Sequence, residues 1–344
     1  MFHKLLQKIA NMKNLLRKIY YQYKLKIGYR AFLASNSTSK VAYIALRQMF
    51  VLTKGKSSDD LSEKISKRIG KYNIIDEKGI LGFENKDAVK KAVVEMKRDG
   101  YYIFEKKLPE SVVNQIVEVA LTTECSYLNV DSGDYEEEKV VINFERILSP
   151  RYEIPASNVV NHPVFQSIIF DTSLLAFAQE YLGVKPIIDL IAFWWSVPFQ
   201  GKGKSAAAQM YHFDLDRIKF LKFFFYLTDV DTNTGPHCYV KASHQGLPKK
   251  IDRDGRFTDE EVAEIYGADN LLEICGVRGS IIAVDTRGFH KGKELLKDKR
   301  LLFQIEFANS MFGQYYPPLK INVLNEANKE IFENYGYTYK QIFY

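Results

Sequence analysis

The chain begins with a repeating pattern of apolar and basic residues. In residues 2–24 apolar side chains recur every three or four positions, the spacing that places them on one face of an α-helix. Lysine and arginine decorate much of the remaining surface. The pattern predicts a basic amphipathic helix whose apolar face contacts an anionic membrane surface, a partner or the rest of the chain. A transit peptide is a further alternative.

Helical patterns continue up to about residue 183 and strands follow. The apolar periodicity, with Asn, Asp, Pro and Gly at the expected ends, predicts further helices over 38–52, 58–70, 86–100, 108–123 and 161–183 and one strand over 101–107. From Lys185 to about Ala308 short strands are predicted over 186–198, 206–216, 218–230, 237–243, 279–286 and 300–308, with one helix at 258–267. Helices followed by strands, without βαβ alternation, predict an α+β fold with an antiparallel barrel or jelly roll.

The composition limits the classes of protein. A chain of 344 residues with 46% hydrophobic residues is long enough for one large domain with additions or for two smaller ones. No run of eighteen apolar residues suggests a membrane span. The three cysteines, Cys125, Cys238 and Cys275, lack metal or redox spacing, and the N-terminus lacks a secretory pattern. We expect a cytoplasmic protein, with peripheral membrane contact through residues 2–24 as the open alternative.

The charge is unevenly distributed along the chain. Residues 1–75 hold 16 Lys or Arg and 3 acidic residues, a net of +13, so that with +6 overall the rest carries −7. We therefore divide the chain into a basic helical N-terminal segment, 1–75, and a second domain, 76–344, that contains the predicted strands. Nothing resembling a nucleic-acid-binding fold accompanies the basic segment, so nucleic-acid binding is not expected.

Two metal-capable side chains stand two residues apart in the predicted strand 206–216. His212 and Asp214 should project from one face, because side chains alternate along a strand. An iron site of the facial type needs a second histidine. His290, at the far end of the predicted strand 279–286, is the candidate, and Arg300 opens the next strand ten residues later.

These residues and the stretches around them resemble the phytanoyl-CoA dioxygenase family of Fe(II)- and 2-oxoglutarate-dependent oxygenases. The similar stretches are "YLTDVDTNTGPHCYVKASH" and "GSIIAVDTRGFHKG", and the resemblance covers about residues 95–310. It implies a double-stranded β-helix, a jelly roll of the cupin-like kind with flanking helices. It also implies iron bound by His212, Asp214 and His290, with Arg300 holding the distal carboxylate of 2-oxoglutarate.

The resemblance further implies an activity. The protein would hydroxylate an unactivated C–H bond of a small or lipid- or sugar-linked substrate, using dioxygen and releasing succinate and CO2. Three protein ligands on one face of the metal leave two positions for the 2-oxo acid and one for dioxygen or water. Because Asp214 is retained, the halogenation of related enzymes, which have a small residue there, is not expected.

The chain departs from the family pattern at two places. The usual Pro-Gly-Ser-His is Lys241–His244 here, and Gly292 stands where a hydroxyl often assists 2-oxoglutarate. The hydroxyl could come from another strand, and the candidates are Tyr211, Tyr226 and Thr228.

Other polar residues are weaker candidates for the site. His237 and His244 lie beyond the turn at Gly235 and are expected to be supporting or structural. Arg287 precedes the distal histidine, and Lys299 would face away from Arg300 on its strand. Both therefore compete poorly for the 2-oxoglutarate carboxylate.

Several features near the predicted site leave alternatives open. Gln304 and Glu306 share a strand face with Arg300 and are expected to contact substrate or to join a polar network. Of Trp194 and Trp195, one should face the barrel and one the helices. The loop Gly201–Lys204 could close over an anionic substrate or simply be solvated.

Two rival functions also remain open. One is a non-catalytic β-helix binding module docked to a membrane or partner through the N-terminal helix. The other is a cupin-like metalloenzyme that does not use 2-oxoglutarate.

Overall fold

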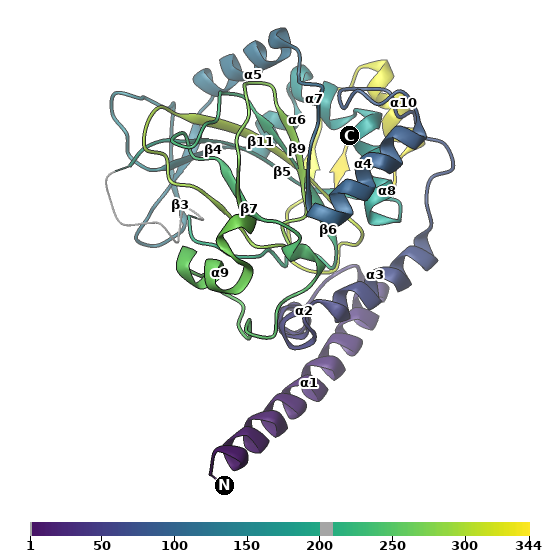
Figure 1. Cartoon of the computed structure of the whole chain (residues 1–344). Helices are drawn as coiled ribbons and strands as arrows, with labels where there is room; N and C mark the ends of the chain where they lie inside the picture. The colour runs from purple at the N-terminus through teal and green to yellow at the C-terminus, as the bar shows by residue number, and fades with distance from the viewer. Residues whose placement is uncertain (1, 200–208) are drawn as a thin grey trace.

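The computed structural model describes residues 2–199 and 209–344 and combines helices with antiparallel sheets (Figure 1). The helices are α1 (Phe2–Ser35), α2 (Lys40–Thr53), α3 (Lys56–Ile69), α4 (Lys86–Asp99), α5 (Glu110–Thr122), α6 (Ala156–Val160), α7 (Pro163–Ile169), α8 (Thr172–Leu182), α9 (Asp259–Tyr266) and α10 (Glu326–Asn334), with 3-10 turns η1 (Ser243–Gln245) and η2 (Ala268–Asn270). The basic loop Gly201–Lys204 lies outside the described residues.

The strands form one large and one small antiparallel sheet. The strands are β1 (Tyr101–Ile103), β2 (Cys125–Leu128), β3 (Tyr135–Val140), β4 (Arg151–Ile154), β5 (Ile187–Ser196), β6 (Phe220–Tyr226), β7 (His237–Val240), β8 (Leu271–Ile274), β9 (Ile281–Val284), β10 (His290–Gly292), β11 (Arg300–Ala308), β12 (Leu319–Lys320) and β13 (Ile342–Phe343). The large sheet has the order β1-β9-β6-β11-β5-β4-β2-β3 and the small one β10-β7-β8, while β12 and β13 pair in parallel.

The two antiparallel sheets pack against each other, and helices cover the outer face of the large one. Between the sheets lies a buried cluster that includes Trp194, Phe224 and Tyr239. On the outer face Trp195 donates its indole N–H to Ala120 O of α5, and Phe177 of α8 packs on Phe223. The predicted division of the two tryptophans between inside and outside is confirmed, because alternate side chains of β5 face opposite ways.

Local sequence signals account for most helix ends. The Asn85 side chain caps α4, and Gly100, at φ 87°, ends it. The single helix predicted over 161–183 is instead two helices, because the Asp171 side chain accepts the Ser173 N–H and starts α8 anew. The strand predicted over 206–216 was also wrong for its described part, where Tyr211 and His212 form only isolated bridges.

The N-terminal helices connect to the body in different ways. Helices α2 and α3 pack on it: the Phe50 ring lies 5.8 Å from that of Phe213, and Ser62 accepts a hydrogen bond from Asn309. Helix α1 leads away from the body, with the N-terminus at its far end (Figure 1). The domain division at residue 75 stays a prediction. Within the described residues, no helix combines the length and apolar character needed to cross a membrane.

Candidate metal centre

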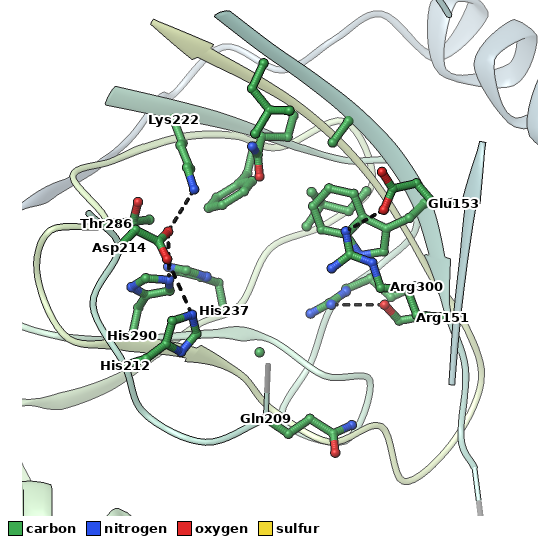
Figure 2. A pocket seen from close by; sticks show the side chains of 18 of the residues that line it. Arg151, Glu153, Gln209, His212, Asp214, Lys222, His237, Thr286, His290 and Arg300 are labelled. Atoms are coloured by element: carbon green, nitrogen blue, oxygen red, sulfur yellow. Dashed lines mark hydrogen bonds and ion pairs between the residues drawn. The ribbon is translucent and has the colours of Figure 1, made fainter. Parts of the chain in front are cut away.

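A cavity of about 360 Å³ is lined by both antiparallel sheets (Figure 2). The large sheet contributes alternate residues of β5, β6 and β11, and the small sheet contributes His237 and His290. The segment before β6 adds His212, Asp214 and Asp216, three residues spaced two apart that all line the cavity. The predicted alternation in this segment therefore holds, although no regular strand forms.

Three of these residues form a candidate metal site. One ligand atom from each of His212, Asp214 and His290 lies within 4.8 Å of the others. Nε2 of His212 is 3.6 Å from Oδ1 of Asp214, and Nε2 of His290 is 3.4 Å from Oδ2. Two imidazoles and one carboxylate on one side of a cavity form the ligand set of non-heme iron sites with open coordination positions. The predicted triad is brought together.

Backbone pairing positions the triad. His212 and His290 exchange both backbone hydrogen bonds, at 3.0 and 2.8 Å, and Asp214 N–H donates to Thr286 O at 2.7 Å. These bonds tie the segment of His212 to the chain on either side of His290. A single bridge and one further hydrogen bond therefore do what a regular strand pair would do.

The histidine rings are oriented for metal binding. Nδ1 of His212 lies 2.9 Å from Met210 O, and Nδ1 of His290 lies 3.0 Å from Gly288 O. A carbonyl only accepts, so each Nδ1 carries the proton and each Nε2 presents a lone pair toward Asp214. Burial and the neighbouring His290 lower the pKa of His212 to about 3. That imidazole is therefore neutral and able to coordinate at neutral pH.

Asp214 is also held by a buried lysine. Lys222 of β6 donates to Oδ2 of Asp214 at 2.8 Å, as the dashed line in Figure 2 shows. Burial alone would raise the pKa of Asp214, but the positive charge of Lys222 holds it well below its ordinary value. The carboxylate is therefore ionised, as a metal ligand must be.

Lys222 is shared by two further carboxylates. Glu306 lies 3.4 Å and Asp216 3.6 Å from its ammonium nitrogen. Glu306 is fully buried, and neither of its carboxylate oxygens has a hydrogen-bond partner among the described residues. Burial and the nearby Asp189 raise the pKa of Glu306 well above its ordinary value. Of the two residues expected to face the substrate, Gln304 lines the cavity and Glu306 lies in this buried charge cluster.

Arg300 lines the same cavity away from the triad (Figure 2). It is buried, donates to Gly235 O and reaches Ser196 Oγ at 3.2 Å. Its Nε has no hydrogen-bond partner, and no carboxylate of the described chain forms an ion pair with it. A buried guanidinium without an acidic partner is costly. The site therefore fits an anionic ligand at this end of the cavity.

Two cavity residues were not predicted to have a direct role. Arg151 of β4 lies beside Arg300, pairs with Glu153 at 3.1 Å, and lies 4.2 Å from the Trp194 ring centroid. His237 lines the cavity with its ring 5.3 Å from that of His290, and its Nε2 has no partner among the described residues. Strand β4 was not predicted, so no local signal placed Arg151 here. His237 could have been found from its alternation along β7.

The candidates for an assisting hydroxyl do not line the cavity. Tyr211 packs in an outer cluster with Phe257, and Tyr226 donates to Ile274 O at 2.8 Å within the core between the sheets. Thr228 accepts the Leu301 N–H at 3.2 Å. Tyr226 lies on β6, Tyr211 forms an isolated bridge and Thr228 follows β6, and all three side chains face elsewhere. The Ser196 hydroxyl lies 3.2 Å from the Arg300 guanidinium, and Ser196 does line the cavity.

The competing cations and the remaining histidine also point away from the cavity. Arg287 forms ion pairs with Asp285 and Asp59, at 2.9 and 3.2 Å, and the Lys299 ammonium lies 3.8 Å from the Phe144 ring centroid. His244 bonds to Lys97 O through Nε2. Of the three cations weighed from the sequence, Arg287, Lys299 and Arg300, Arg300 is the one that lines the cavity.

Comparison with known proteins gives only distant likenesses. No protein-family model and no curated protein matches the chain. The non-heme α-ketoglutarate-dependent epimerase SnoN from nogalamycin biosynthesis is 14% identical, with 65% of this chain and 84% of that chain covered and a TM-score of 0.48. HygX from Streptomyces hygroscopicus, with nickel and 2-oxoglutarate bound, is 12% identical, with 70% of this chain and 93% of that chain covered and a TM-score of 0.45. EctD from S. alaskensis, with bound Fe, is 15% identical, with 70% of this chain and 80% of that chain covered and a TM-score of 0.46.

Proposed function

We propose that this protein is an Fe(II)- and 2-oxoglutarate-dependent dioxygenase that hydroxylates a C–H bond of a small polar substrate. One observation carries the proposal. Nε2 of His212, Nε2 of His290 and the carboxylate of Asp214 converge in a cavity that also contains the buried, acid-free Arg300. The first three groups suit a divalent iron, and the fourth suits the carboxylate of a 2-oxo acid.

The strand arrangement supports a double-stranded β-helix for the core. In chain order, β5, β6, β9 and β11 belong to the large sheet, while the bridge at His212 and strands β7, β8 and β10 belong to the facing one. The chain thus crosses repeatedly between two antiparallel sheets, as in a jelly roll. The metal site lies where His212 pairs beside β10, between the two sheets.

His212, Asp214 and His290 would hold the iron, and Arg300 with Ser196 would hold the distal carboxylate of 2-oxoglutarate. When bound, iron and 2-oxoglutarate together activate dioxygen for C–H hydroxylation, with succinate and CO2 as products. Lys222 keeps Asp214 ionised and fixes the direction of its carboxylate. The Met210 and Gly288 carbonyls keep the two imidazole rings in the coordinating tautomer.

The anionic end of the cofactor matches the charges near Arg300. Arg151 is already paired with Glu153, whereas among the described residues Arg300 has only neutral partners, the Gly235 carbonyl and the Ser196 hydroxyl. One further carboxylate would therefore neutralise this end of the cavity. The unpartnered Nε2 of His237 offers an additional hydrogen bond close to the metal site.

The cavity lining favours a polar substrate over an acyl chain. After the triad and Arg300 are assigned, the lining still includes Asp216, Gln304, Lys222, Gln209 and Tyr316. Lys222 and Asp216 are already ion-paired with each other, but Gln304 and Gln209 can bond to hydroxyl or amino groups that an alkyl chain lacks. Among the substrate classes considered from sequence, a small polar or sugar-like molecule fits this lining best.

An anaerobic titration tests the function. The apoprotein is titrated with Fe(II) and then with 2-oxoglutarate, while the weak visible charge-transfer band of the iron–oxo acid complex is recorded. We compare wild type with Arg300→Ala and, as a matched control, Lys299→Ala, which removes the adjacent but exposed cation. Wild type and Lys299→Ala should give the band, and Arg300→Ala should need at least about tenfold more 2-oxoglutarate.

The other outcomes identify the rival functions. Iron binding without the band in wild type would favour a metalloenzyme that does not use 2-oxoglutarate. A protein that binds no divalent metal, with Asp214→Ala behaving as wild type, would leave the non-catalytic binding module. If the band forms, succinate release against a panel of hydroxylated and amino compounds would then identify the substrate class.

A further inference from the structure

Helix α1 presents a continuous apolar stripe to solvent. Along the helix, large apolar side chains 46% to 61% exposed follow one another at intervals of three or four residues. They are Met12, Leu16, Ile19, Tyr23 and Ile27, flanked by Leu15 and Tyr20. Isolated exposed apolar residues are ordinary, but seven on one side of one helix form a contiguous surface.

The packing of α1 on the body does not use this stripe. The residues that pack are Leu25 and Phe32, which are buried, and Tyr29, whose ring lies 5.3 Å from that of Phe312. At 100° per residue these side chains lie on the opposite side of the helix from Met12, Ile19 and Tyr23. Helix α1 therefore has two apolar faces, one buried against the body and one exposed. Packing against the body explains only the buried face.

The helix is attached closely to the body at its C-terminal half. A Cβ added at Gly28 would lie 2.2 Å from the Ala42 Cβ, so the backbones of α1 and α2 come into close contact there. Arg17 donates to Gln48 of α2 at 3.0 Å. The N-terminal turns continue beyond these contacts, away from the body (Figure 1). The exposed stripe therefore lies on a helix that is held against α2 at Arg17 and Gly28.

Positive charge accompanies the stripe without any acidic residue. The first acidic residue of the chain is Asp59. Among the exposed residues of the described part of α1, Lys13 and Lys26 lie at or beside the stripe, whereas Lys18, seven residues before Leu25, lies toward the packed face. A second copy of this helix would bring like charges together, which disfavours self-pairing. A nucleic acid would match the charge but would leave the apolar stripe without a partner.

We propose that α1 docks this protein on an anionic phospholipid bilayer. The helix lies in the interface, with the stripe from Met12 to Ile27 among the acyl chains and the lysines at the level of the phosphates. An apolar stripe with flanking lysines is the arrangement that binds such an interface, through buried apolar area and attraction to anionic headgroups. Docking is independent of the metal site and would hold for another catalytic function.

Co-sedimentation of the full chain with vesicles tests the proposal. Wild type should bind vesicles containing phosphatidylglycerol and bind weakly to phosphatidylcholine alone. Leu16→Gln with Ile19→Gln removes part of the stripe without changing charge, and should weaken binding at least about tenfold. The matched control is Ile74→Gln with Val323→Gln, two apolar residues exposed elsewhere, which should bind as wild type does.

A charge variant separates the electrostatic contribution. Lys13→Gln with Lys26→Gln should weaken binding to anionic vesicles by about tenfold at low salt, and added salt should weaken wild type in the same direction. Because all these side chains are exposed, the variants should keep the melting temperature of wild type, which shows that they fold.

Three results would overturn the proposal: no binding to anionic vesicles, equal binding by the stripe variant, or equal binding to phosphatidylcholine alone. Light scattering of wild type without vesicles checks the alternative occupant. A dimer that Leu16→Gln with Ile19→Gln converts to a monomer would assign the stripe to a second copy and also overturn docking to lipid. A monomer is the expected result.

Discussion

The ammonium group of Lys222 lies 2.8 Å from Oδ2 of Asp214, the carboxylate of the candidate metal triad. Oδ1 of the same carboxylate lies 3.6 Å from Nε2 of His212 and has no hydrogen bond among the described residues. One carboxylate oxygen is thus held by the protein while the other stays free for a metal. A lysine on β6, in the sheet that faces the histidine pair, therefore helps to define the geometry of the site.

Replacing Lys222 tests this positioning role. Lys222→Met should weaken Fe(II) binding by about 10- to 100-fold, because Asp214 would lose the donor that orients it. Lys222→Gln keeps a hydrogen-bond donor and should bind Fe(II) within a few-fold of wild type. Titration calorimetry under anaerobic conditions measures both. Equal Fe(II) affinity of the Met variant and wild type would show that Asp214 needs no such support.

His237 should contribute to binding of 2-oxoglutarate. Its Nε2 has no partner among the described residues and lies in the cavity beside His290. We expect His237→Phe to raise the 2-oxoglutarate dissociation constant by about 5- to 30-fold, the loss of one or two hydrogen bonds to a charged group, with Fe(II) affinity unchanged. A His244→Phe control should bind the co-substrate normally, because His244 bonds to Lys97 O outside the cavity. An equal loss of Fe(II) affinity in His237→Phe would instead indicate that His237 belongs to the metal site.

Glu306 should make stability depend on pH in an unusual direction. Burial and Asp189 raise its pKa well above the ordinary value, so the folded protein keeps a proton that the unfolded chain releases above about pH 4.3. Stability from this group is complete at low pH and is lost as pH rises toward the folded pKa. Relative to wild type, Glu306→Gln should therefore gain about 1–3 kcal/mol in unfolding free energy between pH 5 and pH 7.

Urea unfolding of the apoprotein at both pH values measures this difference. Glu264→Gln is the matched control, because its partner Lys250 is also exposed and the pair is worth little. A constant difference between Glu306→Gln and wild type at the two pH values would show that Glu306 is ionised in the folded protein.

The close approach at Gly28 should limit which residues α1 tolerates. A Cβ there would lie 2.2 Å from that of Ala42, so Gly28→Val forces the two helices apart. We expect Gly28→Val to lose about 1–3 kcal/mol in unfolding free energy. A control glycine must not have a positive φ, which excludes Gly133. Gly255→Val is the better control, since nothing lies within 4 Å of an added Cβ. A thermal melt with no change for Gly28→Val would show that the helices are not in fixed contact.

Some helices and strands can be predicted from the sequence, and others cannot. Elements with their own signals were found, such as α4 between Asn85 and Gly100 and the apolar strand β11. Short strands such as β4 and β10 were missed, because three or four residues carry too little periodicity and form only by pairing with neighbours already in place. The break between α7 and α8 at Asp171 was missed, because an aspartate is also compatible with the polar face of one continuous amphipathic helix.

What the sequence determined by itself was the identity and order of the chemically capable residues. The spacing of His212 and Asp214, the second histidine at 290 and the arginine at 300 are local features, and alternation along a strand predicts their shared face. The apolar stripe of α1 likewise follows from helical periodicity, whereas its exposure does not.

Only the tertiary structure decided which other side chains reach the cavity. Arg151, His237 and Lys222 face it, while Tyr211 and Thr228 do not. The reason is physical: each of these depends on the register between strands distant in sequence, and a shift of one residue turns a side chain to the other face. The protonation of Glu306 and the orientation of Asp214 likewise arise from burial and from partners that only the folded chain brings together.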